Sequence, residues 1–90
     1  MIRTETIRID FPILESGILY FDNACTTLKP RVVVDVQSEY YLHYSGCAGR
    51  SMHPVGKKTE EKTEEARGKI ARFVHASSGE VVFTKNTTES

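Results

Sequence analysis

Three short polar segments of this sequence contain residue types that could bind an anionic ligand, and the last of them holds Thr87 and Thr88. These threonines follow the apolar run Val81–Thr84 at a point where a new helix would begin. The N-terminus of a helix has unpaired N–H groups and a partial positive charge, which favour a phosphate. The local sequence alone favours ordinary capping over phosphate binding, because threonine is a common capping residue. Asn86 could adopt the left-handed backbone conformation that most residues avoid.

The two other polar segments are residues 22–27 and residues 46–53. Small side chains in the first would allow a ligand to approach the backbone closely. The second combines glycines with Arg50 and His53, which suits the recognition of a carboxylate or a phosphate. The same compositions are typical of an ordinary turn and of a solvent-exposed loop, so both interpretations stay open for each segment.

Cys25 and Cys47 are the two cysteines of the chain. Without secretory features, reduced thiols are the expected state. His43, Cys47 and His53 lack the paired close spacing of zinc modules, which argues against a metal site. Because cysteine is among the most often buried residue types, we interpret both thiols as small packing residues.

Composition and charge exclude several classes of protein. The chain has 90 residues, with 12 basic and 12 acidic side chains, and this balance argues against a dedicated nucleic-acid binder. No apolar run approaches the roughly 18 to 20 residues of a membrane span, and the N-terminus lacks the apolar region of a signal peptide. We therefore expect a soluble, cytoplasmic protein with neither a membrane nor a nucleic-acid partner.

Two helices are expected to position these segments. The first spans about residues 30–44, because a proline suits its first turn and apolar residues recur at helical spacing. The second spans about residues 55–75, ends at Ser77–Gly79, and carries many charges typical of a solvated face. Within it, Glu65 and Lys69 form a favourable i,i+4 pair. The apolar residues at helical spacing in the first helix are Val33, Val36, Tyr40 and Tyr44.

Two short strands are expected beside the helices. Residues 18–21 and 81–84 are apolar, rich in residues that favour strands, and bounded by turn residues. Residues 11–14 form a further apolar cluster, and the proline within it predicts an anchoring turn, since proline fits only the first turn of a helix.

In their order along the chain, these segments resemble the class V aminotransferase and cysteine desulfurase family. The resemblance is nearest to cysteine desulfurases of the selenocysteine-lyase-like group, and it covers nearly the whole chain in one register. Its opening is DFPIL followed by YFDNACTTLKP, and its end is EVVFTKNTTES. The segments that carry it are Asp10–Leu14, Tyr20–Pro30, Glu39–Tyr41, Arg50–His53, Glu65–Val74 and Glu80–Ser90.

The resemblance implies an α/β parent protein with the fold type I of pyridoxal-phosphate (PLP) enzymes, built as a homodimer. This chain would be an α+β fragment of it. Residues 1–79 would belong to the small domain, and residues 80–90 would begin the large PLP-binding domain. Thr88 would contact the cofactor phosphate, with Thr87 beside it. The residues implied to lie near the substrate are Asn23, Ala24, Cys25, Thr26, Arg50 and His53.

Three positions depart from the family pattern. Cys25 replaces the usual alanine, Asn86 replaces a common glycine, and Gly49 stands where many members carry a histidine. The last change removes one candidate polar contact, so the resemblance does not settle the substrate.

In this family the lysine that holds PLP, its aspartate partner and the catalytic cysteine of a desulfurase match positions beyond residue 90. We therefore expect no catalytic residue in this chain, no activity and no PLP binding by the chain alone. A helix that begins at the last residues indicates a fragment. The complete enzyme would convert L-cysteine to alanine and a persulfide, with a possible sulfur-acceptor protein, as in iron–sulfur cluster assembly.

Two alternatives to a cysteine desulfurase stay open. The first is another class V activity, either an aminotransferase or a selenocysteine lyase. The second is a small non-enzymatic interaction module that binds a partner chain through the apolar residues of the first helix.

Overall fold

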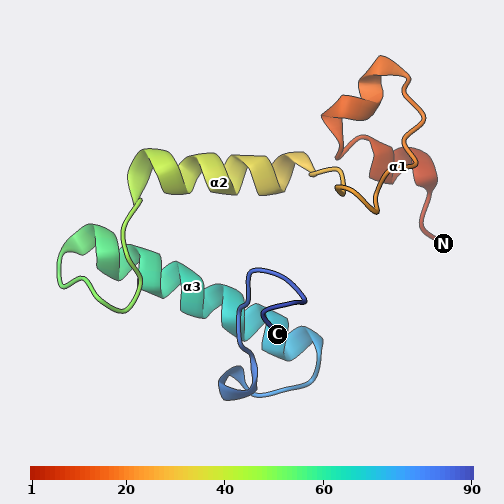
Figure 1. Ribbon diagram of the computed structural model, residues 1–90. Coiled ribbons are helices and arrows are strands. Elements are labelled where there is room, and N and C mark those ends of the chain that lie inside the picture. The colour runs from red at the N-terminus through yellow and green to blue at the C-terminus, as the bar shows by residue number, and fades with distance from the viewer. The chain divides into compact units, whose positions relative to one another are not determined.

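The computed structural model describes all 90 residues and divides them into two units, Met1–His43 and Tyr44–Ser90. Helices are the only regular elements, as the ribbon shows (Figure 1). The predicted helices at 30–44 and 55–75 are confirmed to within one or two residues, the usual uncertainty of a helix boundary. In chain order the elements are α1 (Thr4–Arg8), η1 (Pro12–Ser16), α2 (Arg31–His43), α3 (Pro54–Phe73) and η2 (Ser78–Glu80).

The predicted strands at 18–21 and 81–84 are wrong. Strand structure requires a neighbouring chain segment for its backbone hydrogen bonds, and neither segment pairs with another part of this chain. Val81 does have an extended backbone, with φ −105° and ψ 120°. The composition of the second segment therefore predicted an extended backbone at Val81, but it could not predict whether another segment would pair with it to form a sheet.

In the first unit, one backbone hydrogen bond joins distant residues. The amide of Arg31, at the start of α2, donates to the carbonyl of Asp10 at 2.8 Å. The predicted anchoring turn is confirmed as η1, which has Pro12 in its first turn and ends at Gly17 with a φ of 78°. This positive φ favours glycine, because a side chain there would be strained. The short helix α1 was not predicted, since its residues show no helical periodicity.

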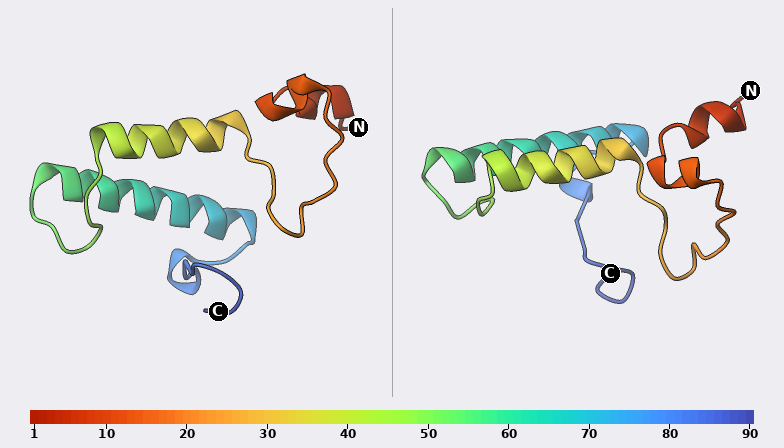
Figure 2. Two further views of the ribbon diagram at one scale, coloured as in Figure 1. Left: turned by 45° about the horizontal axis from the view of Figure 1, so that its top comes forward. Right: turned by 90° about the horizontal axis from the view of Figure 1, so that it is seen from above.

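In the second unit, the loop 44–53 folds onto the first turns of α3. The Thr59 hydroxyl lies 2.5 Å from the Tyr44 carbonyl and 3.0 Å from the Val55 carbonyl. Tyr44 is only 4% exposed, and the ammonium of Lys58 lies 5.4 Å from the centre of its ring, within the range of a cation–π contact. Both views of Figure 2 show this loop, in green, leading into the start of α3.

Two glycines allow the backbones of the loop and the helix to touch. A Cβ atom added to Gly46 would lie 3.0 Å from the amide nitrogen of Gly56. A Cβ atom added to Gly56 would lie only 2.2 Å from the Cβ atom of Ser51. Gly56 is buried, so no larger side chain fits between this loop and α3.

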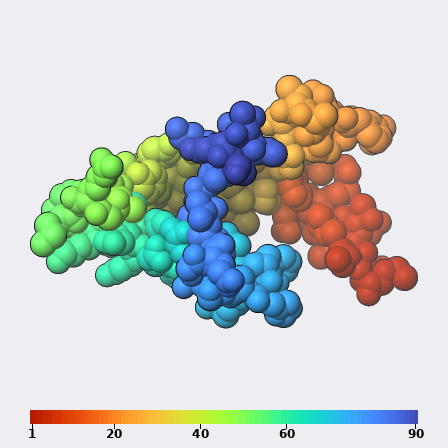
Figure 3. Space-filling view, turned by 60° about the horizontal axis from the view of Figure 1, so that its bottom comes forward, coloured from red at the N-terminus to blue at the C-terminus, as the bar shows by residue number.

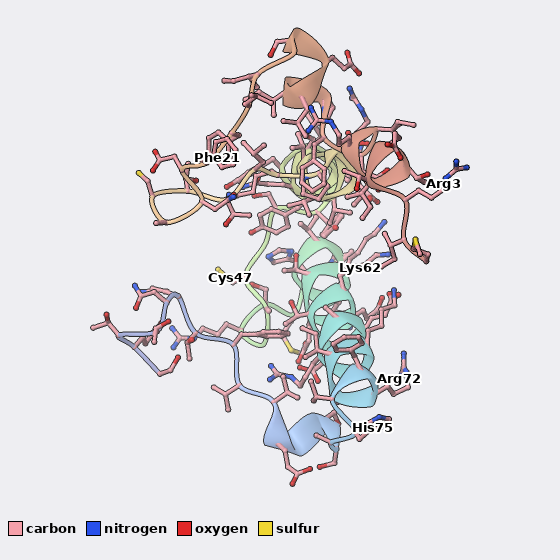
Figure 4. The ribbon with its side chains drawn as sticks, turned by 90° about the vertical axis from the view of Figure 1, so that its right-hand side faces the viewer. Arg3, Phe21, Cys47, Lys62, Arg72 and His75 are labelled. Atoms are coloured by element: carbon pink, nitrogen blue, oxygen red, sulfur yellow. The ribbon has the colours of Figure 1, made fainter.

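The far end of α3 closes at His75. The amide of Ala76 donates to the carbonyl of Ala71 at 2.9 Å, and that of His75 donates to Arg72 at 3.3 Å, which is a Schellman motif. His75 takes the left-handed position of this motif with a φ of 58°, and Figure 4 shows it beyond Arg72 at the helix end. The predicted closure at Ser77–Gly79 is wrong, because the chain reverses before these residues.

Ser77 instead starts the short turn η2. Its amide and its hydroxyl each donate to the Glu80 carboxylate at 2.8 Å. These two bonds, the amide bond first, lower the pKa of Glu80 below its usual value of 4.5. The predicted ion pair of Glu65 with Lys69 is confirmed at 2.6 Å, and together with Lys62 it lowers the pKa of Glu65.

Neither unit has a substantial hydrophobic core. No side chain of the first unit is buried, and in the second unit only Tyr44 and Ala71 are buried apolar residues. Large apolar side chains such as Phe21, Phe73 and Val82 are 79 to 91% exposed. A folded domain normally covers most such surface. None of the helices is both long and apolar enough to cross a membrane.

Replacing Gly56 with alanine should detach the loop 44–53 from α3. The added methyl group would overlap Ser51, and such overpacking typically costs about 1 to 3 kcal/mol. Gly68→Ala is the matched control, because its Cβ atom would meet only the Arg72 guanidinium, at 3.5 Å. Gly68→Ala should raise helix stability by up to about 1 kcal/mol. Thermal unfolding followed by circular dichroism measures both; equal effects would contradict the close approach.

His75→Gly should stabilise the chain by about 1 kcal/mol, because glycine adopts the left-handed conformation without the strain that a side chain brings. His75→Val should destabilise it, since a β-branched residue tolerates this conformation least. Urea unfolding of the three proteins tests the order glycine, histidine, valine. A valine variant as stable as the wild type would show that His75 is not held in this conformation.

The turn η2 should loosen in acid. The Glu80 pKa is lowered in the folded chain, so the carboxylate stabilises the turn above pH 4.5, and this stabilisation is lost as the pH falls through the lowered pKa. An NMR titration of the Glu80 carboxyl carbon should show a midpoint below 4.5. Ser77→Ala should move that midpoint upward; a midpoint indifferent to this change would refute the assignment.

Candidate functional site

Asn86 caps the turn that contains the two predicted phosphate-binding threonines. Its side-chain oxygen accepts a hydrogen bond from the amide of Glu89 at 3.0 Å. The Glu89 carboxylate in turn accepts one from the amide of Lys85 at 2.5 Å. The first bond is the one that a capping side chain makes at a helix start, whereas the second differs from a capping box, in which the amide of the capping residue itself is the donor. Asn86 does not have a positive φ, so the predicted left-handed conformation is wrong; its role is that of a cap.

Because Asn86 provides the cap, Thr87 and Thr88 remain free for a ligand. Both threonines are exposed, and neither their amides nor their hydroxyls have a hydrogen-bond partner within the chain. Two amide and two hydroxyl donors side by side form a set that suits the oxygen atoms of a phosphate. The donor chemistry of this turn therefore fits the phosphate group of PLP.

The turn is also closed on itself by hydroxyl contacts. The hydroxyl oxygens of Thr84 and Ser90 lie 2.9 Å apart. The Ser90 hydroxyl also donates to the carbonyl of Asn86 at 3.2 Å. Residues 84–90 thus form one compact turn, although none of their side chains is buried.

Arg67 of α3 contacts the segment that leads into this turn. Its guanidinium donates a hydrogen bond to the carbonyl of Val81 and lies 4.8 Å from the centre of the Phe83 ring. Its Nε atom lies 3.1 Å from a carboxylate oxygen of Glu64. Figure 3 shows the C-terminal segment, in blue, crossing the surface of α3. The sequence placed Arg67 on the solvated face of the helix, and no local signal distinguished it from the other charged residues there.

In the first unit, the four residues predicted near the substrate lie on a single turn. The amides of Cys25 and Thr26 both donate to the carbonyl of Asp22, at 3.1 and 3.2 Å. The Tyr20 hydroxyl lies 2.5 Å from the carbonyl of Thr26 and 3.1 Å from that of Asp22, so it joins the two ends of the turn. The residues that this turn brings together are Asn23, Ala24, Cys25 and Thr26, all of them exposed.

A pocket of about 270 Å³ adjoins this turn. Of the predicted residues, only Asn23 lines it. Tyr20 and Arg8 were not predicted as pocket residues, although a tyrosine two residues before a polar turn is a usable signal. The lining residues are Ile7, Arg8, Phe11, Leu14, Tyr20, Asn23, Thr27 and Leu28.

The loop at the start of α3 gives its two predicted residues different roles. His53 caps the helix, because its Nδ1 atom accepts a hydrogen bond from the amide of Gly56 at 3.2 Å. Only its Nε2 atom is therefore left for a ligand. Arg50 is exposed and makes no hydrogen bond or ion pair within the chain, so its whole guanidinium is available. Gly49 has a φ of 73°, which a histidine at this position would adopt only with strain.

The loop 44–53 and the turn of residues 84–90, called the phosphate-type turn below, attach to different parts of α3. Arg67 follows His53 by 14 residues, which corresponds to about 20 Å along a helix. No backbone hydrogen bond joins residues 47–53 to residues 84–90. The second unit therefore contains two separate candidate ligand segments, residues 46–53 and residues 84–90, and not one assembled site.

Both cysteines are exposed free thiols, so the interpretation of Cys25 and Cys47 as packing residues is wrong. Figure 4 shows Cys47 projecting from the loop before α3. The glycine-rich and polar neighbours of each cysteine leave no apolar environment to bury it. No group of three potential metal ligands occurs in the chain.

Known proteins with similar sequences are cysteine desulfurases. A probable cysteine desulfurase of Streptomyces coelicolor is 43% identical over 97 aligned residues, covering 100% of this chain and 23% of that protein. A probable cysteine desulfurase of Pyrococcus abyssi is 40% identical over 86 residues, covering 96% of this chain and 21% of that protein. The chain thus spans between a fifth and a quarter of the length of these relatives.

A solved structure has the same fold. The apo structure of cysteine desulfurase from Thermococcus onnurineus NA1 matches with a TM-score of 0.84 and 42% identity, over 99% of this chain and 22% of that one. The family model for aminotransferase class-V matches residues 19–90. This range includes the loop 46–53, the turn 84–90 and the turn after Tyr20. This chain therefore belongs to the class V aminotransferase family, and its similarity to cysteine desulfurases agrees with this assignment.

Proposed function

We propose that this chain is the N-terminal part of a PLP-dependent cysteine desulfurase, which moves sulfur from L-cysteine to a protein thiolate and releases alanine. The observation that carries this proposal is the match to a solved cysteine desulfurase, at 42% identity and a TM-score of 0.84 over 99% of the chain. The exposed apolar side chains of both units support it, because a larger protein would cover them.

The same proposal assigns the parts of the chain. Residues 1–79 belong to the small domain, and residues 80–90 begin the large PLP-binding domain. The complete enzyme is a cytoplasmic homodimer, and it passes sulfur to an acceptor protein, as iron–sulfur cluster assembly requires. The chain alone is inactive.

In this enzyme, Thr88 holds the cofactor phosphate with its hydroxyl and amide, and Thr87 adds the neighbouring donors. PLP supplies the electron sink that labilises bonds at the substrate Cα atom. The Arg50 guanidinium is free to bind the carboxylate of an amino acid, as arginine commonly does. The turn of residues 23–26 leaves its small side chains exposed, so the substrate can approach its backbone.

The test uses the full-length protein. Incubated with PLP and L-cysteine, it should release alanine and form a protein persulfide in equal amounts. Formation of a keto acid from an amino acid donor would instead make it an aminotransferase, and activity limited to selenocysteine would make it a selenocysteine lyase. Neither product, together with no PLP binding, would contradict the proposal and favour an interaction module.

Thr88→Val should weaken PLP binding about tenfold, because it removes one hydrogen bond to a charged group. Thr63→Val is the matched control, since its hydroxyl donates only to the Thr59 carbonyl within α3, at 2.8 Å. PLP affinity is measured by titrating the apoenzyme and following cofactor absorbance. Equal affinities for the two variants would show that Thr88 does not hold the phosphate.

A further inference from the structure

We propose that Arg67 is a positioning residue for the cofactor phosphate, because it ties the segment leading into the Thr87–Thr88 turn to α3. The inference rests on the proposed function and names a residue that does not itself touch the ligand. Arg67 is carried by a rigid helix, whereas residues 81–90 have no regular secondary structure of their own.

The guanidinium of Arg67 makes three contacts in different directions. It donates to the Val81 carbonyl, lies over the Phe83 ring at 4.8 Å, and pairs with Glu64 at 3.1 Å. Its side chain is 24% exposed, whereas those of Lys62 and Lys69 on the same helix are 49% and 65% exposed. Arg67 is thus half-buried between its helix and the extended segment, unlike the solvated cations nearby.

This contact is the one hydrogen bond between α3 and residues 81–90. Val82 is 79% exposed and Phe83 is 46% exposed, so apolar burial alone holds the segment weakly. Upstream, η2 packs against the end of α3 and has its own Ser77–Glu80 bonds, but it makes no hydrogen bond to the helix, so Arg67 provides the hydrogen bond that fixes the segment after it. The lateral position of residues 81–83 on α3 therefore depends on Arg67.

The position of residues 81–83 on α3 also sets the position of the phosphate-type turn. Thr84 directly follows Phe83, and the contact of its hydroxyl with Ser90 closes the turn on itself. Because hydrogen bonds of Asn86 and Glu89 also hold the turn together internally, residues 84–90 form one turn that continues directly from Phe83. Ligand-binding groups must be held to within about 0.5 Å of their productive geometry, so loosening Phe83 weakens phosphate binding.

Arginine suits this task better than lysine. Its planar guanidinium offers several N–H groups in fixed directions and stacks on aromatic rings, while an ammonium group is a single point charge. The three contacts to Glu64, Val81 and Phe83 can be made together only by a group of that shape.

The test compares Arg67→Met with Arg72→Met in the full-length protein. Arg72 lies on the same helix, is exposed, and makes no side-chain hydrogen bond or ion pair, so it is a matched control. The dissociation constants of PLP and of pyridoxal, which lacks the phosphate, are measured for each apoenzyme. Arg67→Met should raise that of PLP about tenfold, the scale of one hydrogen bond to a charged group, and leave that of pyridoxal unchanged. Arg72→Met should change neither.

Amide hydrogen exchange of the apoenzyme gives a second reading without ligand. Exchange at the hydrogen-bonded amides of Lys85 and Glu89 should be faster in Arg67→Met than in Arg72→Met. If Arg67→Met does not fold, Arg67→Lys replaces it, with the same selective loss of PLP affinity expected.

Three outcomes would overturn the inference. Unchanged PLP affinity with unchanged exchange would show that Arg67 does not hold the segment. An equal loss of PLP and pyridoxal affinity would show a general structural role. A wild-type protein that does not bind PLP would overturn the proposed function and this inference with it, which separates that failure from the two others.

Discussion

The close approach of the Gly46 backbone to Gly56, together with the contact of the Thr59 hydroxyl with the Tyr44 carbonyl, is the constraint on which the second unit depends. It places a glycine-rich loop against the first turns of α3, where His53 can cap the helix. About 20 Å further along the same helix, Arg67 holds the extended segment that carries the phosphate-type turn. One helix thus sets the positions of two candidate ligand segments, and polar and backbone contacts do this work in place of a hydrophobic core.

These polar contacts matter for the stability of the fold because few apolar side chains are buried. Only Tyr44 and Ala71 are buried among the apolar residues, whereas a stable domain of this size normally buries a continuous cluster. The apolar surface that the two units leave exposed would be covered by the rest of the proposed enzyme. This agrees with relatives in which the matched segment makes up between a fifth and a quarter of the protein.

Local patterns predicted the helices well, because apolar spacing and capping residues are properties of neighbouring positions. They wrongly predicted strands at 18–21 and 81–84, since whether a segment finds a pairing partner depends on residues distant in sequence. His75 was missed because a left-handed residue at a helix end is usually glycine. Thr87 and Thr88 were identified through resemblance, and the structure added that Asn86 provides the cap and leaves their donors free. Arg67 could not be found by sequence, as its role depends on a contact with residues 14 and 16 positions later.

The proposed role of the turn of Thr87 and Thr88 is to bind a cofactor phosphate in a cysteine desulfurase. A crystal structure of the full-length protein with PLP is its most direct test. We expect a phosphate oxygen within about 3 Å of the Thr88 hydroxyl or amide, with the Asn86 side chain still accepting a hydrogen bond from the amide of Glu89. A phosphate bound elsewhere, with both threonines facing solvent, would contradict it.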